Sequence, residues 1–421
     1  MKKYILYLLT GMAACGLCSC EDALDRYPKD RLTPDNFFRT EEECQLYTND
    51  FYTIFPAAGT IYGETADIIA KTTLTSEVLG NRTVPATANS WKWEKLRDIN
   101  FFLEHSSNCT DEHVRLEYEG VARFFRAWFY FEKVKYYGDV PWVETIQKPF
   151  LLSFSRDPKI EVLGNIIKDL EFAKTYLPDN PDNVKEGKLT TWAARHLLSE
   201  MYLLRGAEGD YKLAEENAQD VIDCPYYSLV KSRYGNAKND PGDYFSDMFV
   251  ENNQNRSAGN TESIWVMQFQ YNTVGGGTNS DDWTRRAWNP QYHAIDGFAL
   301  ADSLGGRGLA QIYPLKWWIG VKGTNATTTG ETIKDVDEMG NMLSSSPISP
   351  DGIFEDGDIR NSEYNIKRNW YYNNPLTPNK LGQKCPIDDK SWSQAQLFPA
   401  LKKFFFGKEE NLQLTGAYKD R

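Results

Sequence analysis

Amphipathic helical segments follow one another through the middle of the chain, and this repetition limits its possible folds more than any other feature. Between residues 119 and 223, apolar side chains recur at spacings of three and four residues, which is the period of a helix with one buried face. Pro178 and Gly206 each end such a segment, as expected of residues that stop helices. The pattern predicts a mostly α-helical fold, with apolar stripes within residues 121–131, 163–177, 194–201 and 214–222.

Residues 191–223 have the spacing of a tetratricopeptide hairpin. Leu198 and Tyr202 lie on its first predicted helix, a glycine-containing turn follows, and the small residues Ala214 and Ala218 on the second helix permit close packing. The turn is a few residues longer than the 34-residue consensus of such repeats allows. We therefore expect tetratricopeptide-like helical hairpins that stack on one another.

The character of the chain changes after residue 230. Residues 231–260 are rich in Asn, Asp and Gly, which indicates long surface loops, and residues 264–271 alternate in a way that makes them the best strand candidate. Beyond Gly275 the sequence is irregular and carries clustered tryptophans, so these loops are expected to build a surface. We predict a helical domain over residues 20–230 and a loop-rich, partly irregular region over 231–421.

The first twenty residues have the pattern of a bacterial lipoprotein leader. A short basic start precedes an apolar run over residues 4–14, which is too short to span a membrane. Residues 1–19 are therefore expected to be removed, leaving Cys20 as the lipidated N-terminus. Cys15 ends a competing cleavage box, and an ordinary cleaved signal remains the alternative. A lipid anchor of two or three acyl chains holds a protein on a membrane without crossing it.

Charge and motifs argue against nucleic-acid binding and against catalysis. With Lys2 and Lys3 removed, 45 basic and 59 acidic residues give a net charge of −14, which repels polyanions and suits a neutral partner. The four histidines form no H-E-x-x-H motif, and neither a G-x-S-x-G motif nor a phosphate-binding glycine loop occurs. We expect a binding protein that needs no cofactor. A glycosidase carboxylate pair remains open, because only spatial separation identifies one.

Aromatic residues are abundant, with 12 Trp, 24 Tyr and 22 Phe. Flat aromatic faces with nearby polar groups are what sugar recognition requires. Two groups of residues in loop-like segments meet that requirement, although any single Trp is also compatible with a place in the core. The candidate ligand-binding residues are Trp91 and Trp93 in the first group, and Asp282, Trp283, Arg285, Trp288 and Tyr292 in the second, with Trp317 and Trp318 as a weaker third pair.

Other conspicuous residues favour structural roles. Arg123 and Arg126 lie on an apolar helical face, where a structural ion pair or a contact with a backbone carbonyl is expected. The acidic segment 354–358 lacks EF-hand spacing, so a solvated turn is favoured over a calcium site, and no metal site is predicted. The widely spaced cysteines fit no zinc pattern, and buried free thiols are favoured over a disulfide for Cys44, Cys109, Cys224 and Cys385.

Several segments, in order along the whole chain, resemble the SusD/RagB family of outer-membrane glycan-binding lipoproteins from Bacteroidetes. The most specific is EGVARFFRAWFYFEKVKYYGDVPW at residues 119–142, where that family has an arginine-rich helix leading into G-D-V-P. The start at Cys20 also matches the family and supports it over Cys15. Further matches are RDIN at 97–100, KDLEFA at 168–173, GKLTTWAARHLLSEMYLLRG at 187–206, TESIWVMQF at 261–269 and FEDGDIR at 354–360.

The resemblance implies helical hairpins that scaffold a loop-rich glycan-binding region on the cell surface. It also implies an oligosaccharide ligand and a partner, a SusC-like TonB-dependent outer-membrane transporter. A peptide-capturing relative with the same partner and, less favoured, a surface glycoside hydrolase are the alternatives. Members of the family usually continue after a Y-x-x-x-R segment into a further helix pair, whereas this sequence ends at Arg421. We therefore expect a chain that lacks the family's C-terminal helices, with an exposed apolar face.

Overall fold

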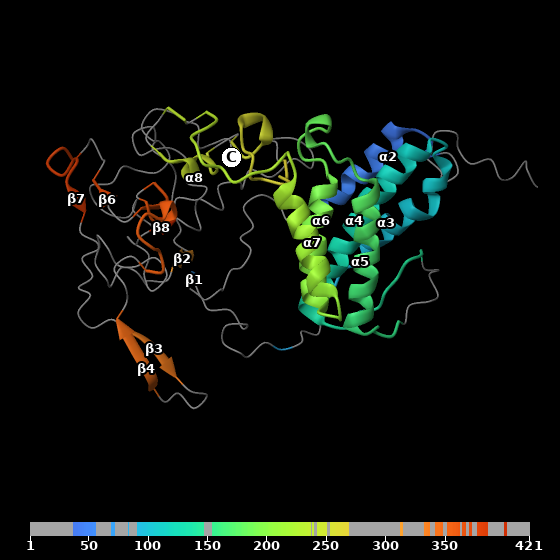
Figure 1. Ribbon diagram of the computed structural model, residues 1–421, viewed down its shortest axis with the longest axis horizontal. Coiled ribbons are helices and arrows are strands. Elements are labelled where there is room, and N and C mark those ends of the chain that lie inside the picture. The colour runs from blue at the N-terminus through green and yellow to red at the C-terminus, as the bar shows by residue number, and fades with distance from the viewer. Residues whose placement is uncertain are drawn as a thin grey trace, which may run out of the picture. The chain divides into compact units, whose positions relative to one another are not determined.

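The structure is a computed structural model in which the chain forms two compact units (Figure 1). Residues 1–52 and 93–176 make up the first unit, and residues 53–92 and 177–421 make up the second. The structure describes residues 37–55, 91–146, 154–236, 242–250, 253–268 and most of 352–385, a few single positions, and the backbone of short strands elsewhere.

The first unit is a helical bundle organised around one long helix. Helix α4 (Glu112–Tyr137) packs along α5 (Lys159–Tyr176) and also contacts α2 (Glu41–Thr48) and α3 (Glu94–His105). The 3-10 turns η3 (Asn49–Ile54) and η4 (Ser106–Asn108) follow α2 and α3. The carboxylate of Asp111 caps α4 by accepting hydrogen bonds from two backbone N–H groups of its first turn, and Gly138, at φ +69°, ends it.

The core of the first unit is formed by the apolar stripes seen in the sequence. Tyr130 is completely buried in α4, where its hydroxyl accepts a hydrogen bond from the backbone N–H of Val143 at 2.7 Å. Each fully buried apolar side chain contributes roughly 1.5–3 kcal/mol, so the interlocked faces supply most of the stability of the bundle. The other large side chains buried at this level are Phe38, Phe51, Ile99, Phe102, Phe125, Leu163, Ile166 and Leu170.

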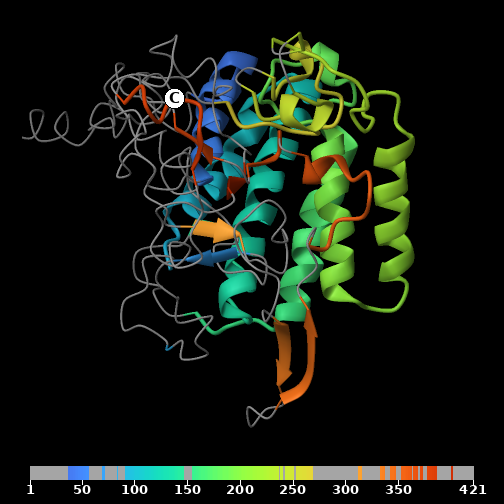
Figure 2. The same ribbon diagram turned by 90° about the vertical axis from the view of Figure 1, so that its left-hand side faces the viewer.

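A helical hairpin forms the regular part of the second unit. Helices α6 (Thr191–Arg205) and α7 (Asp210–Asp223) lie side by side in Figure 1 and Figure 2. Gly206 and Gly209 adopt positive φ angles in the turn, and Asp210 accepts hydrogen bonds from the backbone N–H of Ala207 and from Arg205. The hairpin predicted over residues 191–223 is confirmed.

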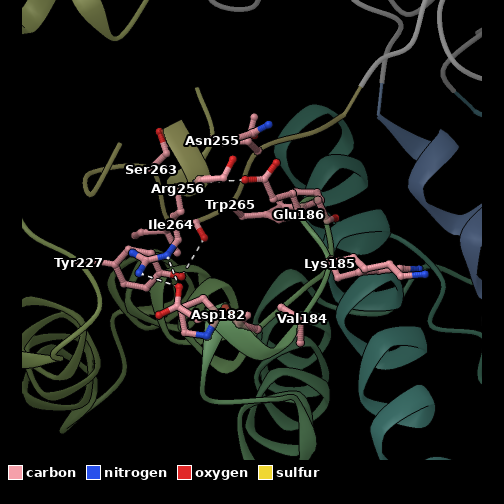
Figure 3. Close-up of a pocket in the computed structure, with 16 residues that line it drawn as sticks. Asp182, Val184, Lys185, Glu186, Tyr227, Asn255, Arg256, Ser263, Ile264 and Trp265 are labelled. Atoms are coloured by element: carbon pink, nitrogen blue, oxygen red, sulfur yellow. Dashed lines mark hydrogen bonds and ion pairs between the residues drawn. The ribbon is translucent and has the colours of Figure 1, made fainter. Parts of the chain in front are cut away.

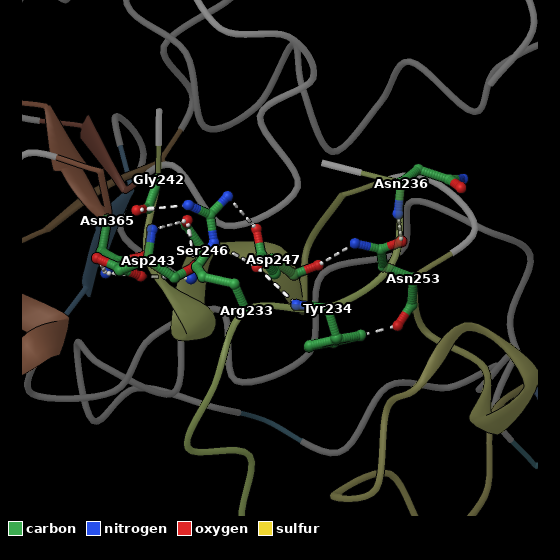
Figure 4. A network of polar contacts seen from close by, with 9 residues as sticks. All are labelled: Arg233, Tyr234, Asn236, Gly242, Asp243, Ser246, Asp247, Asn253 and Asn365. Atoms are coloured by element: carbon green, nitrogen blue, oxygen red, sulfur yellow. Dashed lines mark hydrogen bonds and ion pairs between the residues drawn. The ribbon is translucent and has the colours of Figure 1, made fainter. Parts of the chain in front are cut away.

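The rest of the second unit is loop-rich, as the sequence predicts. Among the described residues it contains the short helix α8 (Tyr244–Asp247) and the 3-10 turns η5 (Pro181–Asn183), η6 (Arg256–Ala258) and η8 (Ile359–Asn361). The buried carboxylate of Asp247 organises this region (Figure 4): Arg233 donates two hydrogen bonds to it, at 2.6 and 2.9 Å, and the backbone N–H of Tyr234 donates a third.

A second carboxylate connects α8 to a distant part of the chain. Asp243 caps α8 and accepts hydrogen bonds from the side chains of Ser362 and Asn365, so residues 359–365 are held against the start of that helix. Hydrogen bonds of polar side chains therefore hold these loop segments together, whereas apolar packing holds the helices of the bundle together.

The strands that the structure describes occur only as antiparallel pairs. The pairs are β1 (Ile69–Lys71) with β2 (Ile312–Pro314), β3 (Thr332–Val336) with β4 (Met342–Pro347), β5 (Ile366–Lys367) with β8 (Ala400–Leu401), and β6 (Trp370–Tyr371) with β7 (Lys384–Cys385). The described residues contain these short pairs beside six helices of eight residues or more, so the mostly helical prediction is confirmed.

The strand predicted over residues 264–271 is wrong for its described part. Residues 264–268 are not assigned to a strand, and residues 269–271 lie outside the described residues. The physical reason is that a side chain takes up a backbone hydrogen-bonding group that a sheet would need. Tyr227 Oη donates a hydrogen bond to the backbone carbonyl of Ile264 at 3.1 Å. Alternating apolar residues here reflect packing of an extended segment against loops.

The leader and the anchor, Cys20, lie outside the described residues, so lipidation stays a prediction. None of the helices in the described part of the chain is both long and apolar enough to cross a membrane. The expected boundary at residue 230 and the absence of the family's C-terminal helices also stay predictions.

Candidate functional site

A pocket of about 260 Å³ lies in the second unit, beside the start of α6 (Figure 3). Residues 181–190, which run from η5 to the helix, form one side of it. Residues 255–266 form the other, and Tyr227 contributes from the segment after α7. The pocket therefore lies where the helical hairpin meets the loop-rich region, and its walls come from three stretches that are distant in sequence.

Hydrogen bonds hold the two sides of the pocket together. The indole N–H of Trp265 donates to the carbonyl of Gly187 at 2.9 Å, and the backbone N–H of Ser257 donates to a carboxylate oxygen of Glu186 at 3.1 Å. The Trp265 ring also packs edge-on against Phe55, with 5.0 Å between ring centroids. The indole is therefore fixed by contacts at its edge and remains half-buried at the pocket.

Gly187 is required by the close approach of these two sides. Its φ is +85°, in the left-handed region that favours glycine. A Cβ atom at this position would lie 2.6 Å from Cγ of Gln268. The glycine in the GKLTTW segment is thus explained by backbone conformation and by space.

The positive charge of Arg256 is compensated within the pocket wall. Its guanidinium forms an ion pair with Asp182, with 3.1 Å between Nη2 and Oδ1, and donates to the carbonyl of Tyr226. It also lies over the ring of Tyr227, 5.1 Å from the centroid. Burial raises the pKa of Tyr227, so its hydroxyl stays protonated at neutral pH and acts as a donor.

Within a lining that also includes the charged residues Lys185, Glu186 and Lys188, one group of side chains suits a small, hydroxylated ligand. Tyr227, Ile264 and Trp265 supply apolar and aromatic surface, and Ser257 and Ser263 supply hydroxyl groups at the same pocket. Such a combination binds a ring that has apolar C–H faces and polar edges. Among the described residues there is also no group of three or more His, Cys, Asp or Glu side chains that could hold a metal ion.

The structure describes two of the seven residues predicted to bind ligand. Trp93 is half-buried, and its ring packs against Phe129 at 5.5 Å and Tyr130 at 6.1 Å between centroids. The ammonium of Lys133 lies 5.9 Å from the same ring. Trp91 is half-buried. Their contact with ligand stays a prediction, and so does that of the residues that lie outside the described ones: Asp282, Trp283, Arg285, Trp288, Tyr292, Trp317 and Trp318.

Most of the pocket could not be recognised from the amino-acid sequence. Asp182 and Arg256 are 74 residues apart, and neither belongs to a recognisable motif. The pattern around Trp265 predicts a strand and not a binding residue. The signal that could have pointed to the pocket is the pair of motifs at 187–206 and 261–269, since Gly187 of the first and Ser263 to Val266 of the second line it.

The arginines of α4 have the structural role that the sequence predicts. Arg126 and Arg123 both form ion pairs with Asp169 of α5, at 2.6 and 3.0 Å. Burial lowers the pKa of Arg126, but the hydrogen bonds and charge of Asp169 outweigh this, and the net pKa is raised. Asp358 in the acidic segment pairs with Arg360 at 2.6 Å, which accounts for that carboxylate.

Comparison with known proteins identifies relatives of the chain. A family model described as "Starch-binding associating with outer membrane" matches residues 58–203. One SusD-like protein of Formosa agariphila is 22% identical over 278 residues, covering 60% of this chain and 49% of the relative. A second from the same organism is 28% identical over 246 residues, covering 53% and 46%. The chain thus spans about half the length of these curated relatives.

Solved structures share the fold. A SusD superfamily protein from Parabacteroides distasonis aligns with a TM-score of 0.57 at 18% identity, covering 89% of this chain and 70% of that one. A protein from Bacteroides fragilis, described as a SusD-like carbohydrate binding protein, aligns with a TM-score of 0.52 at 16% identity, covering 79% and 60%. Family model, curated relatives and solved structures all point in the same direction: the chain is similar to proteins of the SusD/RagB family and shares their fold.

Proposed function

We propose that this protein is a lipid-anchored glycan-binding protein of the bacterial outer membrane. It captures oligosaccharides at the cell surface and passes them to a SusC-like TonB-dependent transporter. The similarity to this family supports the proposal, because the family model that matches residues 58–203 is described as starch-binding and as associating with the outer membrane. The lipoprotein pattern that ends at Cys20 supports the location, since acyl chains on the new N-terminus hold a protein on a membrane.

The pocket at residues 181–190 and 255–266 is our candidate for one sugar-binding position. Its volume of about 260 Å³ lies just below the roughly 300–1,000 Å³ typical of sites for drug-sized ligands, so it suits one sugar ring. Trp265 provides an aromatic surface, while Ser257 and Ser263 provide hydrogen-bonding groups. Trp283 and Trp288, which lie outside the described residues, stay our sequence-based candidates for a second place of contact with an oligosaccharide.

Variants can test the pocket independently of the loops. Val184 lines the pocket and is half-buried, so Val184→Trp fills the space without removing a hydrogen bond that holds the walls. Gln219→Trp adds the same side chain at an exposed position on α7 and serves as the matched control. Calorimetry of the full chain against oligosaccharides should give a Kd of about 10⁻³ to 10⁻⁶ M, weakened at least tenfold by Val184→Trp alone.

The results of these titrations distinguish a wrong binding site from a wrong function. Unchanged affinity of Val184→Trp, together with lost affinity of Trp283→Ala, removes the pocket from the binding site and leaves the function standing. Binding of peptides and of no glycan would favour a peptide-capturing relative. Sustained release of product from a polysaccharide would replace binding by hydrolysis.

A further inference from the structure

The side chain of Thr190 carries a buried hydroxyl at the wall of the pocket. Thr190 lines the pocket and is 3% exposed, and its Oγ1 atom has no hydrogen-bond partner at bonding geometry among the described residues. A buried polar group without a partner costs free energy, so most such groups in proteins are hydrogen-bonded. An unpaired hydroxyl at a candidate binding pocket therefore points to a role outside the fold itself.

The place of Thr190 at the start of α6 makes the unpaired hydroxyl more unusual. Thr190 is the N-cap residue, where a threonine hydroxyl commonly accepts a hydrogen bond from the first turn of the helix, but its side chain makes no such bond. Thr40, the N-cap residue of α2, does accept one, from the backbone N–H of Glu43 at 3.4 Å. The two backbones are alike, with φ −126° at Thr190 and −122° at Thr40. The backbone thus allows the capping bond that Thr190 does not make.

The groups beside Thr190 at the inner end of the pocket are neutral. Thr190 and Tyr227 are buried, whereas Ser257 is exposed and therefore lies at the opening. The hydroxyl of Tyr227 donates its proton to the carbonyl of Ile264 at 3.1 Å (Figure 3). An ionised ligand group at this end would lose its hydration, which is costly without a paired charge. The inner end therefore suits an uncharged hydroxyl group of a ligand.

We propose that Thr190 is a specificity-determining residue of the pocket, which recognises one hydroxyl group of a neutral sugar ring. The inference rests on the proposed function and on the pocket as a sugar-binding position. A threonine side chain has three staggered rotamers, so rotation about its Cα–Cβ bond can turn the shielded hydroxyl toward a ring in the pocket. Because the hydroxyl caps no helix end, this rotation breaks no capping hydrogen bond of α6.

Recognition by a buried hydroxyl selects among sugars more sharply than an apolar wall can. A site that hydrogen-bonds a ligand hydroxyl rejects an analogue lacking it, because the polar group of the site is then left unpaired. In this pocket Trp265 offers its aromatic surface to many rings, whereas Thr190 distinguishes those with a hydroxyl at one position. The pocket should therefore bind a neutral ring more tightly than the matching deoxy sugar.

Thr190→Val tests the proposal, because it replaces the hydroxyl by a methyl group of similar size. The probes are the methyl glycosides of D-glucose, D-galactose, D-mannose and D-xylose, titrated at millimolar concentrations into the full chain and followed by NMR. Thr190→Val should weaken binding of the bound ring about tenfold without lowering the unfolding temperature, and Thr190→Ser should stay within about twofold of the unaltered chain. Thr40→Val is the matched control: it should lower the unfolding temperature and leave the affinity unchanged.

The monodeoxy forms of the bound ring identify the recognised hydroxyl. One of them should bind the unaltered chain about tenfold more weakly than the parent ring, and Thr190→Val should bind the two equally. A purely structural threonine would not produce this coupling between one side chain and one ligand hydroxyl.

Several results would overturn the proposal. A lower unfolding temperature of Thr190→Val would reveal a structural role, such as one beside Tyr227, whose pKa burial raises and the Thr190 hydroxyl partly lowers. Equal affinity of Thr190→Val and the unaltered chain, no binding of any of the four rings, or equal binding of every monodeoxy form would each exclude recognition by Thr190. If the unaltered chain still bound oligosaccharides, the proposed function would stand, whereas absence of all glycan binding would refute both.

Discussion

Replacing Asp169 by alanine should destabilise the protein more than removing any exposed charge. Asp169 lies on α5 with its side chain 3% exposed and is held by Arg126 at 2.6 Å and Arg123 at 3.0 Å. The Arg126 side chain is itself only 6% exposed. The substitution therefore leaves a buried guanidinium without its anion in the contact between α4 and α5.

The expected loss follows from that burial. Breaking a buried ion pair by removing one partner costs about 3–5 kcal/mol, a large part of the roughly 5–15 kcal/mol that stabilises a typical domain. Asp220→Ala is the control, because Asp220 pairs with Arg195 with its side chain 52% exposed, and such pairs contribute under about 1 kcal/mol. Adding Arg126→Met to Asp169→Ala removes the stranded charge and should restore part of the loss.

Urea unfolding measures these differences. Far-UV circular dichroism follows the helices and tryptophan fluorescence follows the packing, so agreement of the two transitions checks that a single free energy of unfolding describes the process. The buried charge would not be the cause if the free energies of unfolding of Asp169→Ala and Asp220→Ala differed by less than about 1 kcal/mol. The same conclusion would follow if adding Arg126→Met to Asp169→Ala lowered the free energy of unfolding further.

Two further predictions concern the second unit. Gly209→Ala should lower the free energy of unfolding by about 1–2 kcal/mol, because of the positive φ alone. Gly187→Ala should lower it more, by roughly 2–3 kcal/mol, because its Cβ also meets Gln268. Thermal unfolding of both variants checks this order. The hydrogen bond from Arg205 lowers the pKa of Asp210, so this contact stabilises the protein above the unfolded-state pKa of about 3.9 and is lost as pH falls through the lower, folded value. Asp210→Asn should therefore flatten the acid side of the profile of unfolding temperature against pH, and an unchanged profile would contradict it.

Helical periodicity was sufficient to predict the bundle and the hairpin. The α6–α7 hairpin, its glycine turn and the pairing of α4 arginines follow from local spacing and from the cost of burying an unpaired charge. Local patterns succeed there because helix formation depends on residues three or four apart.

The pocket could not be predicted in the same way. It depends on contacts between residues that are distant in sequence, such as the ion pair of Asp182 with Arg256, and only the tertiary fold brings these residues together. The alternation around Trp265 predicts a strand. In the structure, the backbone carbonyl of Ile264 instead accepts a hydrogen bond from the hydroxyl of Tyr227, and the indole N–H of Trp265 donates one to the carbonyl of Gly187. Side-chain hydrogen bonds of this kind produce no regular spacing of residue types along a sequence.

Calorimetric titration of the full chain with a panel of oligosaccharides and peptides decides whether this protein binds glycans. We predict saturable binding of at least one glycan with a Kd between about 10⁻³ and 10⁻⁶ M, no release of shortened product, and no comparable binding of peptides. Peptide binding without any glycan binding, or steady turnover of the titrated sugar, would contradict it.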